Sequence, residues 1–187
     1  MTAIAEKRMD WQAFKNLEIE AGDLFIYELI NGILMKRSAP SLRHQNVVSA
    51  LLSLMRLFAD DHQLGKVFTA PIDVFFDDGN GYQPDICFVS NERAFLLDND
   101  EFINGAPDLV VEVLSPGTWK NDRMAKKAVY EQFAVREYWI VDPHYKSVEV
   151  YIIENNAYRL FSGLEQEGKV VSTVLEGFEV ELQRIFE

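Results

Sequence analysis

The sequence predicts an α/β fold, with a mixed β-sheet, flanking helices and extra β-hairpins. Residues 107–142 read as strand, break, helix, strand, which is the pattern of a βαβ unit. Two dipeptides that favour positive φ each lie between apolar runs, as in β-hairpins; they are Asn31-Gly32 and Asn155-Asn156. Residues 41–60 carry apolar side chains at helical spacing, which indicates an amphipathic helix.

The N-terminal third is predicted to form a short helix, a hairpin and a long helix. Residues 9–17 have apolar side chains at helical spacing, with Asp10 as the N-cap, and the hairpin covers 24–35. Ser41 is predicted to cap the long helix. The buried stripe of this helix consists of Val47, Val48, Leu51, Met55 and Phe58. His44 falls on the same stripe, where both a partly buried structural histidine and a functional one remain possible.

Short strands dominate the rest of the chain. Residues 65–76 read as two strands divided by a proline, and a turn at 77–81 precedes a strand at 86–90. After a long surface connection, 109–114 is a near-continuous apolar strand, as found where a strand is covered on both faces. The next helix, capped by Thr118 or Asn121, is predicted to reach about residue 133. A strand at 137–141, a hairpin at 148–161 and two late strands within 170–182 complete the chain.

A glutamate inside the apolar strand needs an explanation. Glu112 lies within VVEVL, where an ionised carboxylate is costly unless it is paired, hydrogen-bonded or bound to a metal. Asp85 stands at the head of another apolar run. If the two strands are antiparallel neighbours, these positions meet, with Cβ atoms about 5 Å apart. Two carboxylates this close repel, and a divalent cation, Mg²⁺ or Mn²⁺ for oxygen ligands, is the usual remedy.

A lysine on the following helix is the natural partner of these carboxylates. Lys126 is placed on the helix face that it shares with Arg123 and Tyr130, from which its ammonium could reach the pair. Two carboxylates, a metal and a lysine form a site for phosphodiester hydrolysis. The alternative is a purely structural ion pair between Lys126 and Glu112. Glu28 lies in the apolar hairpin arm, where an exposed edge glutamate is equally compatible with the pattern.

Composition limits the class of protein. The length of 187 residues is most simply one domain, residues 1–187. No apolar run approaches the length of a membrane span, and the N-terminus lacks the apolar core of a secretory signal, so we expect a cytoplasmic protein without a membrane partner. The net charge of −12 weighs against a protein that coats nucleic acid. Five bases between residues 115 and 136 answer this only in part.

Several of these motifs together resemble one family. They are Tyr27 to Gly32, His44, Pro84-Asp85, Val111 to Pro116, Lys126 with Tyr130, and Glu137 to Asp142. From about Trp11 to Phe186 the chain is similar to the Uma family of restriction-endonuclease-like proteins, in the PD-(D/E)xK nuclease superfamily. The superfamily lysine normally lies two residues after the glutamate, where this chain has Leu114. In this family the lysine is moved to the helix, at Lys126.

The resemblance implies a restriction-endonuclease-like core and metal-dependent cleavage of DNA. It implies Asp85, Glu112 and the carbonyl of Val113 as ligands of Mg²⁺ or Mn²⁺. It also implies Lys126 as a catalytic residue, joined at the site by Glu28 and His44. Ala134 stands where the family often has a helix-ending glycine. The alternatives are a non-catalytic module for binding or dimerisation and a hydrolase of smaller phosphoesters. An edge hairpin and the need to cut two DNA strands predict a homodimer.

Overall fold

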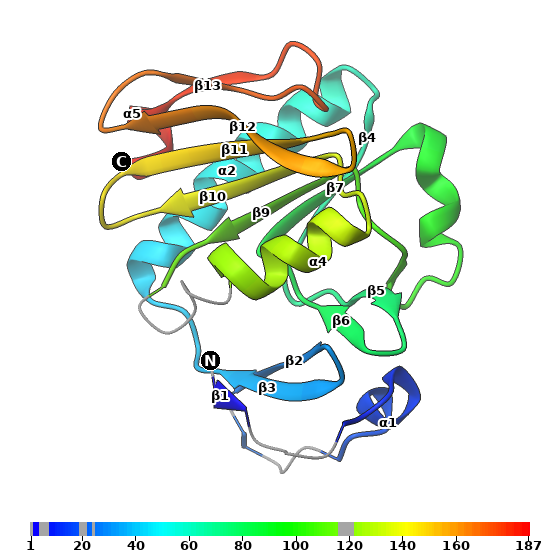
Figure 1. The fold of residues 1–187 in the computed structure, drawn as a ribbon. Coiled ribbons are helices and arrows are strands. Elements are labelled where there is room, and N and C mark those ends of the chain that lie inside the picture. The colour runs from blue at the N-terminus through cyan, green and yellow to red at the C-terminus, as the bar shows by residue number, and fades with distance from the viewer. Residues whose placement is uncertain (1, 4–7, 19–21, 24, 116–121) are drawn as a thin grey trace.

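The computed structural model describes residues 2–3, 8–18, 22–23, 25–115 and 122–187. These residues form two six-stranded sheets, a two-stranded ribbon and a few helices (Figure 1). The fold is therefore mixed α/β, as predicted, but it contains two mixed sheets where one was expected. The predicted hairpin at 24–35 pairs with further strands on both of its edges and so becomes part of the second sheet, whereas the predicted hairpin at 148–161 belongs to the central sheet.

The central sheet has the strand order β12-β11-β10-β9-β7-β4. Its strands are β4 (Gly65–Thr69), β7 (Ile86–Ser90), β9 (Leu109–Val113), β10 (Glu137–Asp142), β11 (Ser147–Glu154) and β12 (Ala157–Glu165). Strands β9 and β10 run parallel, and the other neighbours are antiparallel. The predicted βαβ unit is thus confirmed, with β9 and β10 as its two strands.

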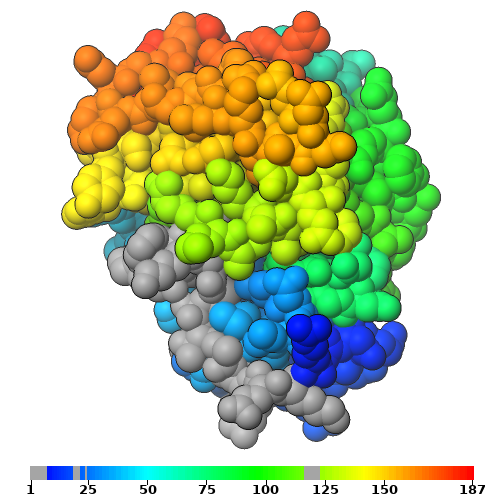
Figure 2. Space-filling view, in the orientation of Figure 1, coloured from blue at the N-terminus to red at the C-terminus, as the bar shows by residue number. Residues whose placement is uncertain are grey.

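The second sheet has the order β1-β3-β2-β6-β5-β8. It comprises β1 (Thr2–Ala3), β2 (Ile26–Ile30), β3 (Ile33–Arg37), β5 (Val74–Asp77), β6 (Asn80–Tyr82) and β8 (Ile103–Asn104). A separate ribbon pairs β13 (Lys169–Val171) with β14 (Glu179–Glu181). In the space-filling view the blue N-terminal residues lie at the opposite end of the molecule from the orange β12 (Figure 2).

Helices cover both faces of the central sheet. The helical segments are α1 (Trp11–Lys15), α2 (Leu42–Asp61), the 3₁₀ segment η1 (Asn91–Leu97), the π-helical turn η2 (Asp122–Lys126), α4 (Lys127–Gln132) and α5 (Leu182–Phe186). Helix α2 lies on one face and α4 on the other (Figure 1). Asp10 and Ser41 cap α1 and α2 with their side chains, as predicted. None of the helices among the described residues combines the length and apolarity needed to cross a membrane.

Alternation along β9 sends its side chains into two different cores. Leu109, Val111 and Val113 pack towards α2, whereas Val110 and Leu114 belong to the core beneath α4. Because successive side chains of a strand point to opposite faces, Glu112 lies on the α4 face.

The helical segment that carries Lys126 differs from the predicted one. Lys126 lies in a π-helical turn and not in a regular α-helix, and such turns are frequent at functional sites. The predicted caps Thr118 and Asn121 lie outside the described residues.

Ala134 adopts the left-handed conformation that normally favours glycine. Its φ is 55°, and the helix-end hydrogen bonds from Val135 N to Tyr130 O (2.9 Å) and from Ala134 N to Glu131 O (3.0 Å) are both made. The ending of α4 therefore keeps the geometry that glycine would give, at the cost of strain around the alanine Cβ.

Replacing Ala134 by glycine is expected to stabilise the protein by about 1 kcal/mol, since the relief of strain exceeds the extra entropy of the unfolded chain. Urea unfolding of wild type and Ala134→Gly measures the change. Ala128→Gly, within the regular part of α4, is the matched control and should be destabilising by about 1 kcal/mol. A loss of stability in both variants would show that the left-handed residue carries no strain.

Candidate active site

Strand register brings Asp85 and Glu112 to facing positions. Strands β7 and β9 are antiparallel neighbours, which is the condition under which the two carboxylates were expected to meet, and Ile86 pairs with Val111. One step further along this register, Asp85 stands opposite Glu112. Both residues lie on the α4 face, because Ile86 and Val111 point to the α2 core. Both are buried, with 4% of Asp85 and 2% of Glu112 exposed.

Asp85 is held by donors from three elements. Its Oδ2 accepts a hydrogen bond from the main-chain N–H of Val113 at 2.8 Å and lies 3.1 Å from His44 Nε2 on α2. Its Oδ1 lies 3.5 Å from Arg37 Nη1. Burial raises the pKa of Asp85, but the His44 contact and the charges of Arg37 and Lys126 outweigh it, so that the pKa lies below its usual value. The structure thus favours an ionised Asp85.

Glu112 receives its hydrogen bonds from η2 and α4. Its Oε1 accepts from the hydroxyl of Tyr130 at 2.7 Å and from Lys126 Nζ at 3.0 Å. Burial and the neighbouring Glu112 charge raise the pKa of Tyr130 well above its ordinary value. The phenol therefore stays protonated and serves as a donor. Lys126 lies four residues before Tyr130, and together they fix one oxygen of the carboxylate.

Glu28 is buried and reaches the same lysine from the second sheet. Its exposed fraction is 0%, so the reading as an exposed edge glutamate is wrong. Its Oε1 lies 3.0 Å from Lys126 Nζ and accepts a hydrogen bond from Gln83 N at 3.0 Å. Its Oε2 lies 4.0 Å from Arg37 Nε. The apolar residues around Glu28 belong to strand β2, whose second half is buried.

Five charged residues consequently form one alternating row between the two sheets. We call the row Asp85–Arg37–Glu28–Lys126–Glu112 the charge chain. Each neighbouring pair of side chains in it lies between 3.0 and 4.0 Å apart, and no member is more than 7% exposed. Buried charges are tolerated when they are compensated in this way. The row contains one more carboxylate than cation, which leaves a residual negative charge if His44 is neutral.

Two members of the site were missed from the sequence. Arg37 was not among the residues expected at the site, but its side chain is buried and its Nη2 donates to Gln83 O at 3.2 Å. Tyr130 was placed on the lysine face without a role. The sequence signal for Tyr130 was its spacing from Lys126. For Arg37 there was none, because its position depends on how the hairpin docks against the central sheet.

The carboxylate oxygens of Asp85 and Glu112 are of the chemical type that binds a divalent cation. Carboxylate oxygens are the ligands that Mg²⁺ and Mn²⁺ prefer, and within the described residues the Oδ1 of Asp85 accepts no hydrogen bond. The main chain at Val113 contacts Asp85 through its N–H, whereas the resemblance implied its carbonyl as a ligand. Among the described residues no three acidic, histidine or cysteine side chains cluster as a metal cage. An ion here would therefore share the carboxylates with Arg37 and Lys126.

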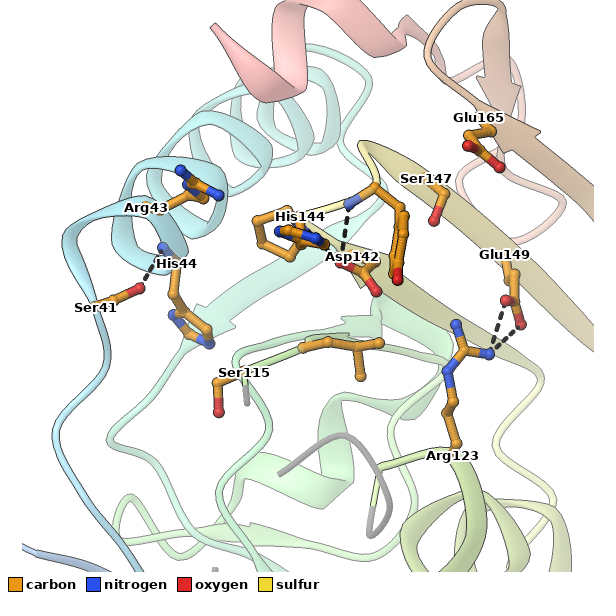
Figure 3. Close-up of a pocket in the computed structure, with 13 residues that line it drawn as sticks. Ser41, Arg43, His44, Ser115, Arg123, Asp142, His144, Ser147, Glu149 and Glu165 are labelled. Carbon is orange, nitrogen blue, oxygen red and sulfur yellow. Dashed lines mark hydrogen bonds and ion pairs between the residues drawn. The ribbon is translucent and has the colours of Figure 1, made fainter. Parts of the chain in front are cut away.

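A pocket of about 950 Å³ adjoins the charge chain. His44 links the two, because it lines the pocket and contacts Asp85. The other lining residues come from the start of α2, the segment after β9, η2, the region around the β10–β11 turn and the end of β12. They are Ser41, Arg43, Leu114, Ser115, Arg123, Asp142, Pro143, His144, Tyr145, Ser147, Glu149 and Glu165. Arg43 and His44 lie on one side, and Arg123 and Glu149 on the other (Figure 3).

Comparison with known proteins connects this arrangement to one family. Over 95% of its length the chain superposes on 97% of a solved chain from Anabaena variabilis, described as a "putative nuclease belonging to DUF820", with a TM-score of 0.79 and 19% identity. This likeness establishes the shared fold. No protein of curated function matches the chain. Residues 11–183 match the Uma2 family, described as "Putative restriction endonuclease". The chain therefore belongs to the Uma2 family.

Proposed function

We propose that the protein is a metal-dependent endonuclease that hydrolyses phosphodiester bonds of DNA. The observation that carries the proposal is the pair of facing carboxylates, Asp85 and Glu112, with Lys126 Nζ 3.0 Å from Glu112. The family description and the shared fold support the same reading. Asp85 and Glu112 would hold Mg²⁺ or Mn²⁺, and the ion would polarise the phosphoryl group and acidify water.

The chain's own residues have separable tasks in this proposal. Asp85 is kept ionised by His44 and Arg37, and the anionic carboxylate is the form that can bind a cation. Tyr130 and Lys126 fix one oxygen of Glu112. The ammonium of Lys126 lies beside the carboxylate pair, where it can steady negative charge that develops on the phosphate. Glu28 holds the lysine from the opposite sheet.

The test is a metal titration followed by plasmid nicking. Nicking is expected to depend on Mg²⁺ or Mn²⁺, to stop when the metal is chelated, and to be absent with Ca²⁺, which takes more ligands at longer distances. Isothermal titration of the ion in the absence of DNA gives an independent readout of the site. Metal binding without nicking of any DNA substrate would refute the proposed activity and leave the site as a metal-binding structure.

A second candidate is a non-catalytic module for binding or dimerisation. It is favoured by the charge chain, whose carboxylates already have positively charged partners without a metal. We propose a homodimer for either function, because β12 forms an open edge of the central sheet. Light scattering during size-exclusion chromatography measures the mass. A monomer at micromolar concentration rejects the homodimer, and a dimer that neither binds metal nor nicks DNA favours this module.

A further inference from the structure

The pocket beside the charge chain has no function assigned so far. It opens where β9 ends, and Leu114 and Ser115, which line it, directly follow the strand that carries Glu112. Its walls carry charged and aromatic side chains from α2, η2 and the turn between β10 and β11. His44 is the lining residue that contacts Asp85. A ligand on the His44 side of the pocket would therefore lie next to Asp85.

We infer that this pocket binds single-stranded nucleic acid, one or two nucleotides at a time, in preference to an intact duplex. The inference rests on the proposed phosphodiester hydrolysis and specifies its substrate. Three properties of the pocket lead to it, namely its size, its charge and its aromatic lining.

The size of the pocket and the burial of Asp85 and Glu112 favour a nucleotide strand whose bases are not stacked in a duplex. A volume of about 950 Å³ belongs to the range of sites for small ligands. The side chains of Asp85 and Glu112 are only 5% and 2% exposed, so a phosphate on the surface of a rigid duplex stays outside their reach. Enzymes with enclosed reactive groups act on single strands or on nucleotides turned out of the helix.

The charged side chains that line the pocket can hold only a small number of phosphate groups. Arg123 is engaged by both oxygens of Glu149, at 2.7 and 3.0 Å. Asp142 accepts hydrogen bonds from the main-chain N–H groups of His144 and Tyr145. Arg43 is exposed and forms no ion pair within the described part of the chain. Glu165 adds a third carboxylate to a lining that holds two arginines. Arg43 alone can hold one or two phosphates at most, whereas duplex binding draws on many such contacts.

The aromatic lining supplies a platform for a base. Tyr145 is 59% exposed, and its ring lies 4.8 Å from that of His144 in an edge-to-face arrangement. Proteins that bind single strands combine such stacking residues with cations that follow the backbone. Tyr145 and Arg43, which both line the pocket, provide these two elements.

Fluorescence anisotropy with labelled oligothymidylate of about six nucleotides, in chelator to prevent cleavage, measures this binding. The single strand is expected to bind at least about tenfold more tightly than a hairpin duplex of about twelve base pairs, which stays paired in the assay, and Tyr145→Ala and Arg43→Ala should each weaken single-strand binding about tenfold. Because only one or two phosphates are held, log K should fall with log salt with a slope of about −1. Phe95→Ala and Arg56→Ala, at exposed positions outside the pocket, are the matched controls and should bind like wild type.

Equal or tighter binding of the duplex overturns the inference, as does a Tyr145→Ala protein that binds like the Phe95→Ala control. The proposed hydrolysis is scored separately, by adding Mg²⁺ to the same oligonucleotides. Pocket-dependent binding of the single strand without cleavage refutes the hydrolysis and leaves the inference standing. Cleavage that prefers intact duplex refutes the inference and leaves the hydrolysis standing.

Discussion

Replacing Glu112 by glutamine is expected to reduce DNA nicking at least about a hundredfold, which is the usual cost of losing an electrostatic group at a reaction centre. The change removes a negative charge but keeps the shape of the side chain. The amide oxygen can still accept the hydrogen bond from Tyr130, which is 2.7 Å from the carboxylate. Lys126 keeps Glu28 as its partner at 3.0 Å. We therefore expect a folded protein with a melting temperature close to that of wild type.

Glu137 offers a matched control, because it is a fully buried glutamate in the neighbouring strand β10. Its carboxylate accepts hydrogen bonds from Trp139, Ser172, Thr173 and Val174 on the α2 face, away from the charge chain. Glu137→Gln should lose about 1–3 kcal/mol of stability, because a donor amide replaces an acceptor, and retain the activity of its folded fraction. Nicking assays and urea unfolding on both variants give the comparison. Equal activity of Glu112→Gln and wild type would remove Glu112 from the reaction centre.

The sequence was sufficient for the fold wherever local signals determine it. Asn31-Gly32 and Asn155-Asn156 mark turns through their backbone preferences, and residues 31, 155 and 156 do adopt positive φ. The side-chain caps of α1 and α2, at Asp10 and Ser41, were predictable for the same reason, since a cap requires only residues close in sequence. The number of sheets was not predictable, because it depends on pairings such as β2 with β6 that join distant segments.

In the candidate site, too, the residues marked by a local sequence signal were predictable, and those placed by contacts between distant segments were not. Glu112 was identifiable because a carboxylate in an apolar strand requires compensation, and its spacing from Asp85 required only one assumed strand pairing. The partners of these carboxylates were harder to find. Arg37 comes to Asp85 by the docking of one sheet on another. The π-helical turn that carries Lys126 also has no clear signature in the sequence. The roles of Asp85, Glu112, Lys126, Glu28 and His44 in catalysis remain predictions.

Replacing Lys126 by methionine is expected to destabilise the protein by about 3–5 kcal/mol, because it leaves two buried carboxylates without their shared cation. Lys126 is 1% exposed and lies 3.0 Å from both Glu28 and Glu112. Methionine keeps much of the volume, so packing contributes little to the loss. The double variant Lys126→Met/Glu28→Gln removes one of the stranded charges and should recover at least about half of the lost stability. Urea unfolding of wild type, both single variants and the double variant measures this coupling.

The pH dependence of the Lys126→Met variant has a definite sign. Without the ammonium, two buried carboxylates repel each other, and a proton bound at this pair relieves the repulsion in the folded protein alone. A group whose pKa is raised on folding binds its proton more tightly in the folded protein, so its contribution is present at low pH and is lost as the pH rises. The deficit relative to wild type should thus shrink towards pH 5 and grow towards pH 8. A deficit that is independent of pH would attribute the loss to packing, and Lys126 would then have no electrostatic part in holding the carboxylates.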